Sequence, residues 1–215
     1  SMSDDIVKVT ESGIVMVPDN SISTAKIQDG SVTLSKLASD STARFTFAGS
    51  GQPNGVVTGI VGEKYVDTDA TAGAVEWIKM SGTGNTGWEV SVGDTGWRAV
   101  TDLLLNGWLT AADRITIRRQ NNVVTLMLGD MDGRSATTDV IMTLPSGFRP
   151  NWQYNVPSYT TSGATSSRSV NAVYTGTVTW CGTPRPTYEN ALFTYLTSDA
   201  WPTTLPGSAS GSIPA

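Results

Sequence analysis

The chain contains no histidine and only one cysteine, Cys181, among its 215 residues. Without histidine, a Ser-His-Asp or Cys-His nucleophile, a histidine-ligated metal site and the usual imidazole general base are all excluded. A single cysteine permits no disulfide within the chain and no multi-cysteine metal site, so stability outside a cell must come from another source, such as assembly. We expect Cys181 to be a small apolar core residue rather than a nucleophile.

Charged residues are also scarce, at 15% of the chain, and the net charge is -5. A nucleic-acid partner requires a concentrated basic face, and the only basic cluster is Arg114, Arg118 and Arg119. No apolar run approaches the roughly 18 residues that cross a bilayer, and the N-terminus lacks the pattern of a signal peptide. The sequence therefore predicts no nucleic-acid partner and no membrane insertion.

Threonine (30), serine (23) and glycine (22) are abundant, and there are seven tryptophans and six tyrosines. Threonine, valine, isoleucine and aromatic residues suit a pleated, half-buried surface better than a helix. We therefore expect an all-β protein with little helix.

An internal repeat lies near the N-terminus, where residues 19–28 (DNSISTAKIQ) align with residues 29–38 (DGSVTLSKLA). The apolar residues recur every fifth position, which fits neither a helix face nor a strand face over the whole segment. Such a segment gains burial only by packing against copies of itself or other chains, and the alternative is a solvated linker. The pattern leaves both interpretations open.

A small module follows a boundary placed near residues 49–55, where glycine, proline and asparagine accumulate. Residues 63–68 and 75–80 are typical of two strands joined by a turn at residues 69–73. A hairpin of two strands is marginal alone, so this module is also expected to need partners.

The remainder has many short strands. Residues 114–120 and 122–128 predict a hairpin around Asn121-Asn122, with Ile115, Ile117, Val124, Leu126 and Leu128 on the core side. Further strands are expected at 138–144, 169–175, 177–181 and 191–196, which together indicate an antiparallel β-sandwich or jelly roll. The predicted organisation is an N-terminal extension (1–18), a fibrous repeat segment (19–50), a β-hairpin module (51–92) and a sandwich head (93–215).

No acidic constellation selects a metal or catalytic site. Asp130-Met131-Asp132-Gly133 begins like a calcium loop, but Ile141 stands where the distal glutamate would be needed, so we expect a tight turn. Glycoside cleavage requires two facing carboxylates, and spacing selects no pair. The candidates are Asp94, Asp102, Asp113, Asp130, Asp132, Asp139, Glu189 and Asp199. The sequence therefore predicts no cofactor, no metal and no enzyme.

Aromatic residues suggest carbohydrate binding instead, because sugars stack their apolar faces on tryptophan and tyrosine. Trp152 and Tyr154 alternate and are expected to point the same way, with Tyr159 and the loop 160–169 close by in sequence. Buried packing is the alternative for Trp152. Tyr188, in the proline-containing loop 183–190, is a further candidate. We assign Trp108, Trp180 and Phe193 to the core, and expect Arg149 to close a loop by bonding carbonyls.

Three stretches carry a resemblance to known proteins. The repeat STAKIQDGSVTLSKLA resembles repeats of bacteriophage tail fibres and minor tail proteins, and residues 55–90, with YVDTDATAG and KMSGTGNTGW, are similar to a small module of tail fibres and tailspikes. Residues 96–108, the hairpin 115–128, IMTLPSGFRPN (141–151) and SDAWPTTLPGSA (198–209) resemble C-terminal heads of minor tail proteins from phages of actinobacteria.

This resemblance implies a homotrimeric fibre in the virion tail whose C-terminal head binds a receptor on the host surface. The receptor is expected to be an envelope glycan, and the N-terminus is expected to join other virion tail proteins. The chain is expected to be the C-terminal part of a longer fibre, because it has no obvious anchoring domain. The alternatives are a tail-associated polysaccharide depolymerase and a purely structural tail component.

Overall fold

The structure is a computed structural model that describes residues 8–9, 15–16, 27–28, 31, 46–110, 114–160 and 165–211. The chain divides into two units, residues 1–44 and residues 45–215. In the first unit, β1 (Lys8–Val9) pairs antiparallel with β2 (Val15–Met16). The repeat predicted at residues 19–38 lies outside the described residues, apart from positions 27, 28 and 31.

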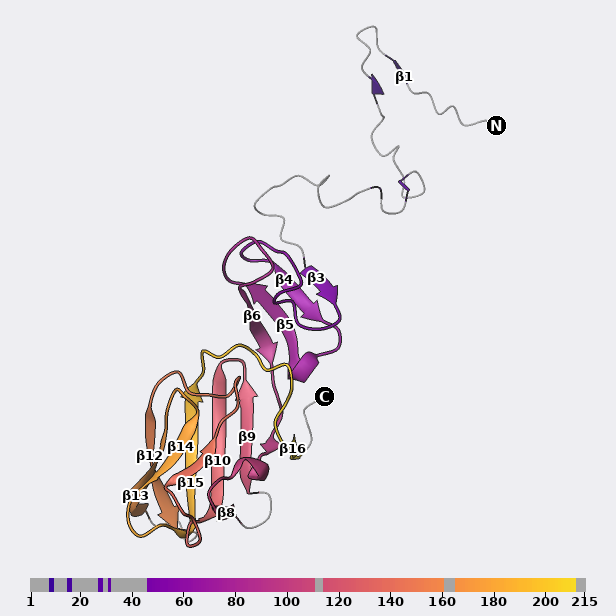
Figure 1. The fold of residues 1–215 in the computed structure, drawn as a ribbon. Helices are drawn as coiled ribbons and strands as arrows, with labels where there is room; N and C mark the ends of the chain where they lie inside the picture. The colour runs from indigo at the N-terminus through magenta and orange to yellow at the C-terminus, as the bar shows by residue number, and fades with distance from the viewer. Residues whose placement is uncertain are drawn as a thin grey trace. The chain divides into compact units, whose positions relative to one another are not determined.

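The second unit begins with a small sheet of four strands in the order β3-β4-β5-β6 (Figure 1). These are β3 (Thr46–Gly49), β4 (Lys64–Asp67), β5 (Ala74–Lys79) and β6 (Trp88–Gly93). β3 is parallel to β4, and the other pairs are antiparallel. The predicted hairpin is confirmed as β4–β5, and its connection includes a short 3-10 turn, Thr71–Gly73.

The small sheet has its own core, which the C-terminal part of the chain completes. Tyr65, Trp77 and Trp88 are buried there together with Trp201. The indole of Trp201 donates a hydrogen bond to the carbonyl of Ala72 at 3.1 Å, across 129 positions of sequence. The hairpin was expected to be covered by other chains, but part of its apolar surface is covered by the C-terminal part of its own chain.

A fully buried lysine holds the glycine-rich loop beside this core. The ammonium of Lys79 donates hydrogen bonds to the carbonyls of Gly84 and Thr86, and lies 5.7 Å from the ring centre of Trp88. A buried cation is costly unless it is paired or hydrogen-bonded, so these carbonyls stabilise the charge and the charge fixes the loop.

The large sheet contains ten strands and curls on itself (Figure 1). Its main order is β11-β14-β13-β12-β15-β10-β9-β7-β16, all antiparallel, with β8 pairing beside β10. The strands are β7 (Arg98–Ala99), β8 (Leu109–Thr110), β9 (Ile115–Gln120), β10 (Val123–Asp132), β11 (Val140–Thr143), β12 (Tyr154–Thr160), β13 (Thr165–Ala172), β14 (Thr177–Cys181), β15 (Thr187–Leu196) and β16 (Ser208–Ala209). An isolated β-bridge joins Leu104, which lies between β7 and β8, to Met142 of the edge strand β11.

The all-β prediction is confirmed. The described residues contain short 3-10 turns but no α-helix, and none of their segments is a helix able to cross a membrane. The hairpin around Asn121-Asn122 is also confirmed, with Val123 opposite Gln120 and Asn121 at a φ of 51°. Asparagine tolerates this left-handed conformation, which the two-residue turn requires.

The core of the large sheet contains the residues that the alternating pattern assigned to it. Trp108, Trp180 and Phe193 are buried, as predicted, with the apolar residues of β9 and β10. The sheet therefore buries one face, and its opposite face is available for other contacts.

Three local predictions are wrong. Asp130 and Asp132 belong to β10 instead of a tight turn, because the strand continues through a bulge in which Asp130 has a φ of 49°. Cys181 is exposed, because Trp180 takes the inward position and the next side chain of the strand points outward. Residues 165–169, which were expected to belong to a loop at 160–169, form the start of the strand β13.

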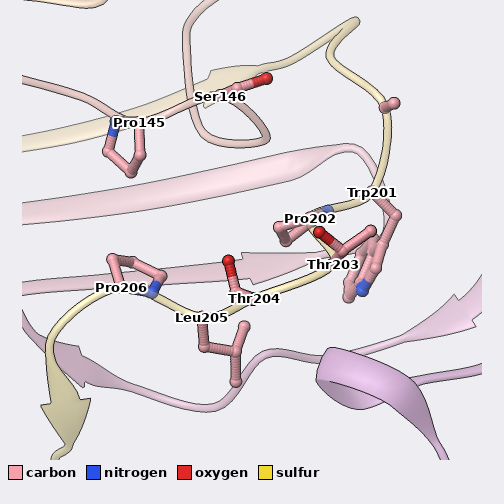
Figure 2. A pocket seen from close by; sticks show the side chains of 9 residues that line it. Pro145, Ser146, Trp201, Pro202, Thr203, Thr204, Leu205 and Pro206 are labelled. Atoms are coloured by element: carbon pink, nitrogen blue, oxygen red, sulfur yellow. The ribbon is translucent and has the colours of Figure 1, made fainter.

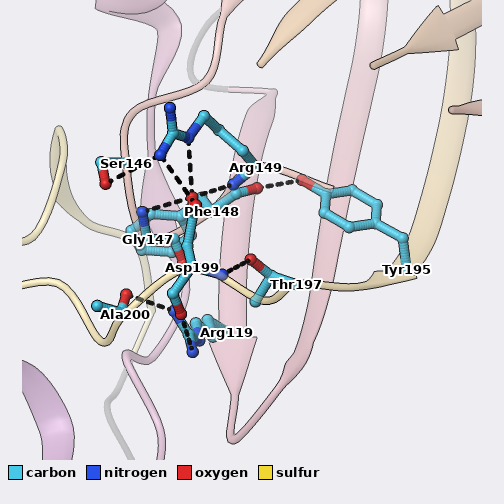
Figure 3. Close-up of polar contacts among 9 residues, drawn as sticks. All are labelled: Arg119, Ser146, Gly147, Phe148, Arg149, Tyr195, Thr197, Asp199 and Ala200. Carbon is cyan, nitrogen blue, oxygen red and sulfur yellow. Dashed lines mark hydrogen bonds and ion pairs between the residues drawn. The ribbon is translucent and has the colours of Figure 1, made fainter. Parts of the chain in front are cut away.

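Arg119 ties the start of the C-terminal segment to the large sheet (Figure 3). It is 5% exposed, its guanidinium donates four hydrogen bonds of 2.7–3.0 Å to backbone carbonyls, and it lies 4.8 Å from the ring centre of Trp201. The acceptors belong to Asn121, Gly147, Asp199 and Ala200. Burial lowers the pKa of Arg119 to about 10, so it remains charged at neutral pH.

Asp199 fixes the neighbouring loop from the other side (Figure 3). Its carboxylate accepts hydrogen bonds from the backbone N–H groups of Gly147 and Arg149 and from the Arg149 guanidinium. Burial raises the pKa of Asp199, but the hydrogen bonds from Arg149 and Gly147 outweigh it and hold the pKa below its usual range. The carbonyl-bonding role expected for Arg149 therefore belongs to Arg119, and Arg149 pairs with a carboxylate.

Candidate functional site

Two exposed aromatic side chains flank a hollow on the outer surface of the large sheet. Trp152 is 73% exposed and Tyr174 is 67% exposed. With Gln153 and Asn155 they line a hollow of about 310 Å³. Two aromatic rings beside two amides combine stacking surfaces with hydrogen-bonding groups, which is the chemistry that sugars require.

The positions of these aromatic residues follow from where strands begin and turn. Trp152 lies in a bend between Pro150 and the start of β12, so it does not share the strand alternation of Tyr154. Tyr174 lies in the turn from β13 to β14, which Val173 N–H closes by bonding the carbonyl of Thr177 at 3.1 Å. Because turns at strand ends project their side chains outward, both rings remain in solvent.

The expectation that Trp152 and Tyr154 point the same way is therefore wrong. Tyr154 is half-buried and packs against the core, with its ring 5.7 Å from the ring of Tyr195 and its hydroxyl 3.1 Å from Asn151 Oδ1. Of these two residues, Trp152 is available to a ligand. Packing against the core, which was the alternative considered for Trp152, is found at Tyr154 instead.

A comparison of the sequence with models of protein families and with curated proteins finds no match.

The other two predicted site residues lie at the opposite end of β12. Tyr159 is half-buried and faces Asn190 across the β12–β15 pair. Tyr188 is 44% exposed, and the Arg134 guanidinium lies 5.5 Å from its ring centre. A seven-residue strand spans about 20 Å, so the four predicted residues form two separate groups, one at each end of the strand.

The end that carries Tyr188 is rich in paired charges. Arg114 contacts Asp130 at 2.7 Å, Arg134 contacts Asp132 at 2.7 Å, and Arg168 pairs with Glu189. The hydrogen bond from Arg134 lowers the pKa of Asp132.

Glu189 is 2% exposed and also accepts a hydrogen bond from the Ser158 hydroxyl at 2.6 Å. Glycoside cleavage requires a raised pKa on its acid and access to substrate for both carboxylates. The carboxylates Asp130, Asp132 and Glu189 are instead paired with arginines.

A second, larger hollow of about 460 Å³ lies beside the C-terminal segment (Figure 2). Three of its lining residues are prolines, and Trp201, which borders it, is buried with its indole N–H already bonded to the carbonyl of Ala72. The lining residues are Pro145, Ser146, Ala200, Trp201, Pro202, Thr203, Thr204, Leu205 and Pro206. This hollow has hydroxyl groups but no exposed aromatic face on which a sugar could stack, so the Trp152–Tyr174 hollow is the better candidate.

Sequence reasoning found Trp152 but missed its partner. Tyr174 fell within the strand expected at 169–175, where it would have shared a sheet face with its neighbours. The signal in the sequence was Gly176, because glycine favours turns. In the structure Gly176 has a φ of 92°, which belongs to a turn rather than a strand. A turn at this point places Tyr174 at a strand end.

Proposed function

We propose that this protein is a tail fibre or minor tail protein of a bacteriophage and binds a glycan of the host envelope through its C-terminal head. The observation that carries glycan binding is the pair of exposed rings, Trp152 and Tyr174, which line one hollow together with the amides of Gln153 and Asn155. The sequence resemblance described above supports the virion setting. A bacterium of the actinobacterial group is the proposed host.

A binding role is favoured over the depolymerase alternative by the state of the carboxylates. Asp130, Asp132 and Glu189 are each ion-paired with an arginine, and none lines the aromatic hollow. When incubated with surface polysaccharide, the protein is therefore expected to bind the polymer without releasing reducing ends.

The proposal is tested with a fluorescent fusion of the full chain on a panel of actinobacterial strains. The fusion is expected to label some strains, and mild periodate should remove the labelling because it cleaves the vicinal diols of sugars. Protease treatment of the same cells, as the matched control, should leave the labelling intact. Labelling that resists periodate and disappears with protease would contradict a glycan receptor.

We further propose that the chain acts as a homotrimer, and an exposed apolar face of the large sheet supports assembly. On β10 and β15, Val123 lies opposite Leu196, and Met127 lies opposite Leu192. These four side chains are 37–46% exposed. Adjacent exposed apolar residues of this kind are typical of a protein contact surface, and copies of the same chain are the proposed occupant.

Assembly is tested by light scattering at micromolar concentration. The wild-type protein is expected to have three times the chain mass of 22.7 kDa. The double variant L192E/L196E should shift toward the monomer, because two carboxylates would be buried in the interface. Leu105→Glu, an exposed position on another segment, is the control and should remain trimeric. A stable wild-type monomer would contradict the proposed assembly.

A further inference from the structure

A row of uncharged polar side chains extends from the aromatic hollow across three strands. Asn155 of β12 lies opposite Asn171 of β13, and Asn171 lies opposite Thr179 of β14. Neighbouring strands are about 4.8 Å apart, so the row spans about 10 Å from β12 to β14. This length exceeds what a single sugar ring would cover.

The side chains of the row point away from the core. Asn171 stands between the buried residues Val170 and Ala172, and Thr179 stands between the buried residues Val178 and Trp180. Because successive side chains of a strand alternate between faces, Asn171 and Thr179 share the outer face with Asn155, which is exposed. All three belong to the same surface as the hollow.

The polar atoms of this row are available to a ligand. Within the part of the chain that the structure describes, the side chains of Gln153, Asn155, Asn171 and Thr179 make no hydrogen bond to other residues. Amide and hydroxyl groups offer both donors and acceptors, as sugar hydroxyls do. A polyhydroxyl chain laid along the row would find a partner on each strand.

The chemistry of the row also disfavours a charged ligand. Its neighbours on the outer face are Pro157, Ser169 and Thr177, which are uncharged as well. The arginines nearest to the row in sequence are already paired with carboxylates. Arg168 pairs with Glu189, Arg149 with Asp199 and Arg185 with Asp139. An acidic sugar would therefore lose hydration without gaining a cation, whereas a neutral sugar would lose little.

From these observations we infer that the head binds a linear, uncharged polysaccharide, one end of which stacks on Trp152 and Tyr174 while the chain continues over Asn155, Asn171 and Thr179. This inference rests on the proposed glycan-binding function. It adds the class of glycan and the direction in which it crosses the sheet.

The test uses an array of neutral hexose and pentose polymers with their oligosaccharides and monosaccharides, together with a uronic acid polymer and a sulfated polymer. The full chain is expected to bind neutral chains, with affinity rising with chain length. N171A and T179V should each weaken binding of the long neutral chains about fivefold, since each removes one hydrogen-bonding partner. Binding of the shortest sugars should be unchanged in both variants.

The control is Thr116→Val, which makes the same change on β9, outside the row. It should bind every probe as the wild type does. If N171A and T179V also bind long neutral chains as the wild type does, or if the acidic polymers bind more tightly than the neutral ones, the inference is overturned while glycan binding stands. If the wild type binds no member of the array although periodate abolishes cell labelling, the inference fails and the proposed function stands.

Discussion

Replacing Arg119 with methionine is expected to lower the melting temperature by roughly 6–12 °C. Methionine has a similar length and is apolar, so it can occupy the space but cannot donate to the four carbonyls that the guanidinium now satisfies. A buried polar group left without a partner costs about 1–3 kcal/mol, and the group of four is expected to cost at least about 3 kcal/mol in total. Thermal unfolding followed by circular dichroism measures the loss.

Two further variants sharpen this prediction. Arg119→Lys keeps the charge, but one ammonium cannot reproduce the planar fork of donors, so its melting temperature should lie between those of R119M and the wild type. Lys64→Gln removes a partly exposed ion pair with Glu76 and should change melting by no more than a few degrees. An R119M protein that melts within a few degrees of the wild type would show that the carbonyls find other partners.

Arg119 also illustrates what the sequence could not show. The sequence placed it in a basic cluster with Arg114 and Arg118, and cluster membership says nothing about burial. The carbonyls that it binds come from three separate segments, near residues 121, 147 and 199. Only the folded chain brings these segments together.

Local patterns did predict the hairpins. The β9–β10 pair combines strict alternation of apolar residues with an Asn-Asn turn, so its register follows from the sequence alone. The β4–β5 pair was predicted for similar reasons, but its core was not, because Trp201 reaches it from the far end of the chain. Contacts between distant segments leave no local pattern.

The candidate site was predicted only in part, again because it depends on how separate segments pack together. Trp152 stood out as an aromatic residue in a polar stretch, but β12 was missed because Pro157 interrupts the pattern of a strand. β12 pairs with β15 only at Tyr159 and Thr160, so one side of the strand is free near Pro157 and tolerates its missing N–H. Because β12 was not predicted, the sequence could not show that Trp152 and Tyr188 lie far apart, or that Tyr174 lies close to Trp152.

The double variant W152A/Y174A is expected to show the largest loss of binding. Each ring contributes about 0.5–1.5 kcal/mol by stacking, so removal of both should weaken binding at least about fivefold per head. Attachment of a trimer through three heads would magnify this loss. Both rings are exposed, so the melting temperature should not change.

The most direct test of glycan binding by the hollow is the labelling of periodate-sensitive cells by fusions of the wild type, W152A/Y174A and Tyr188→Ala, with melting measured in parallel. Tyr188 is a matched exposed aromatic residue at the other end of β12. We predict that labelling is lost in W152A/Y174A, is retained in Y188A, and that all three proteins melt alike. Retained labelling in W152A/Y174A with lost labelling in Y188A would contradict this account and place the glycan site at the opposite end of the head.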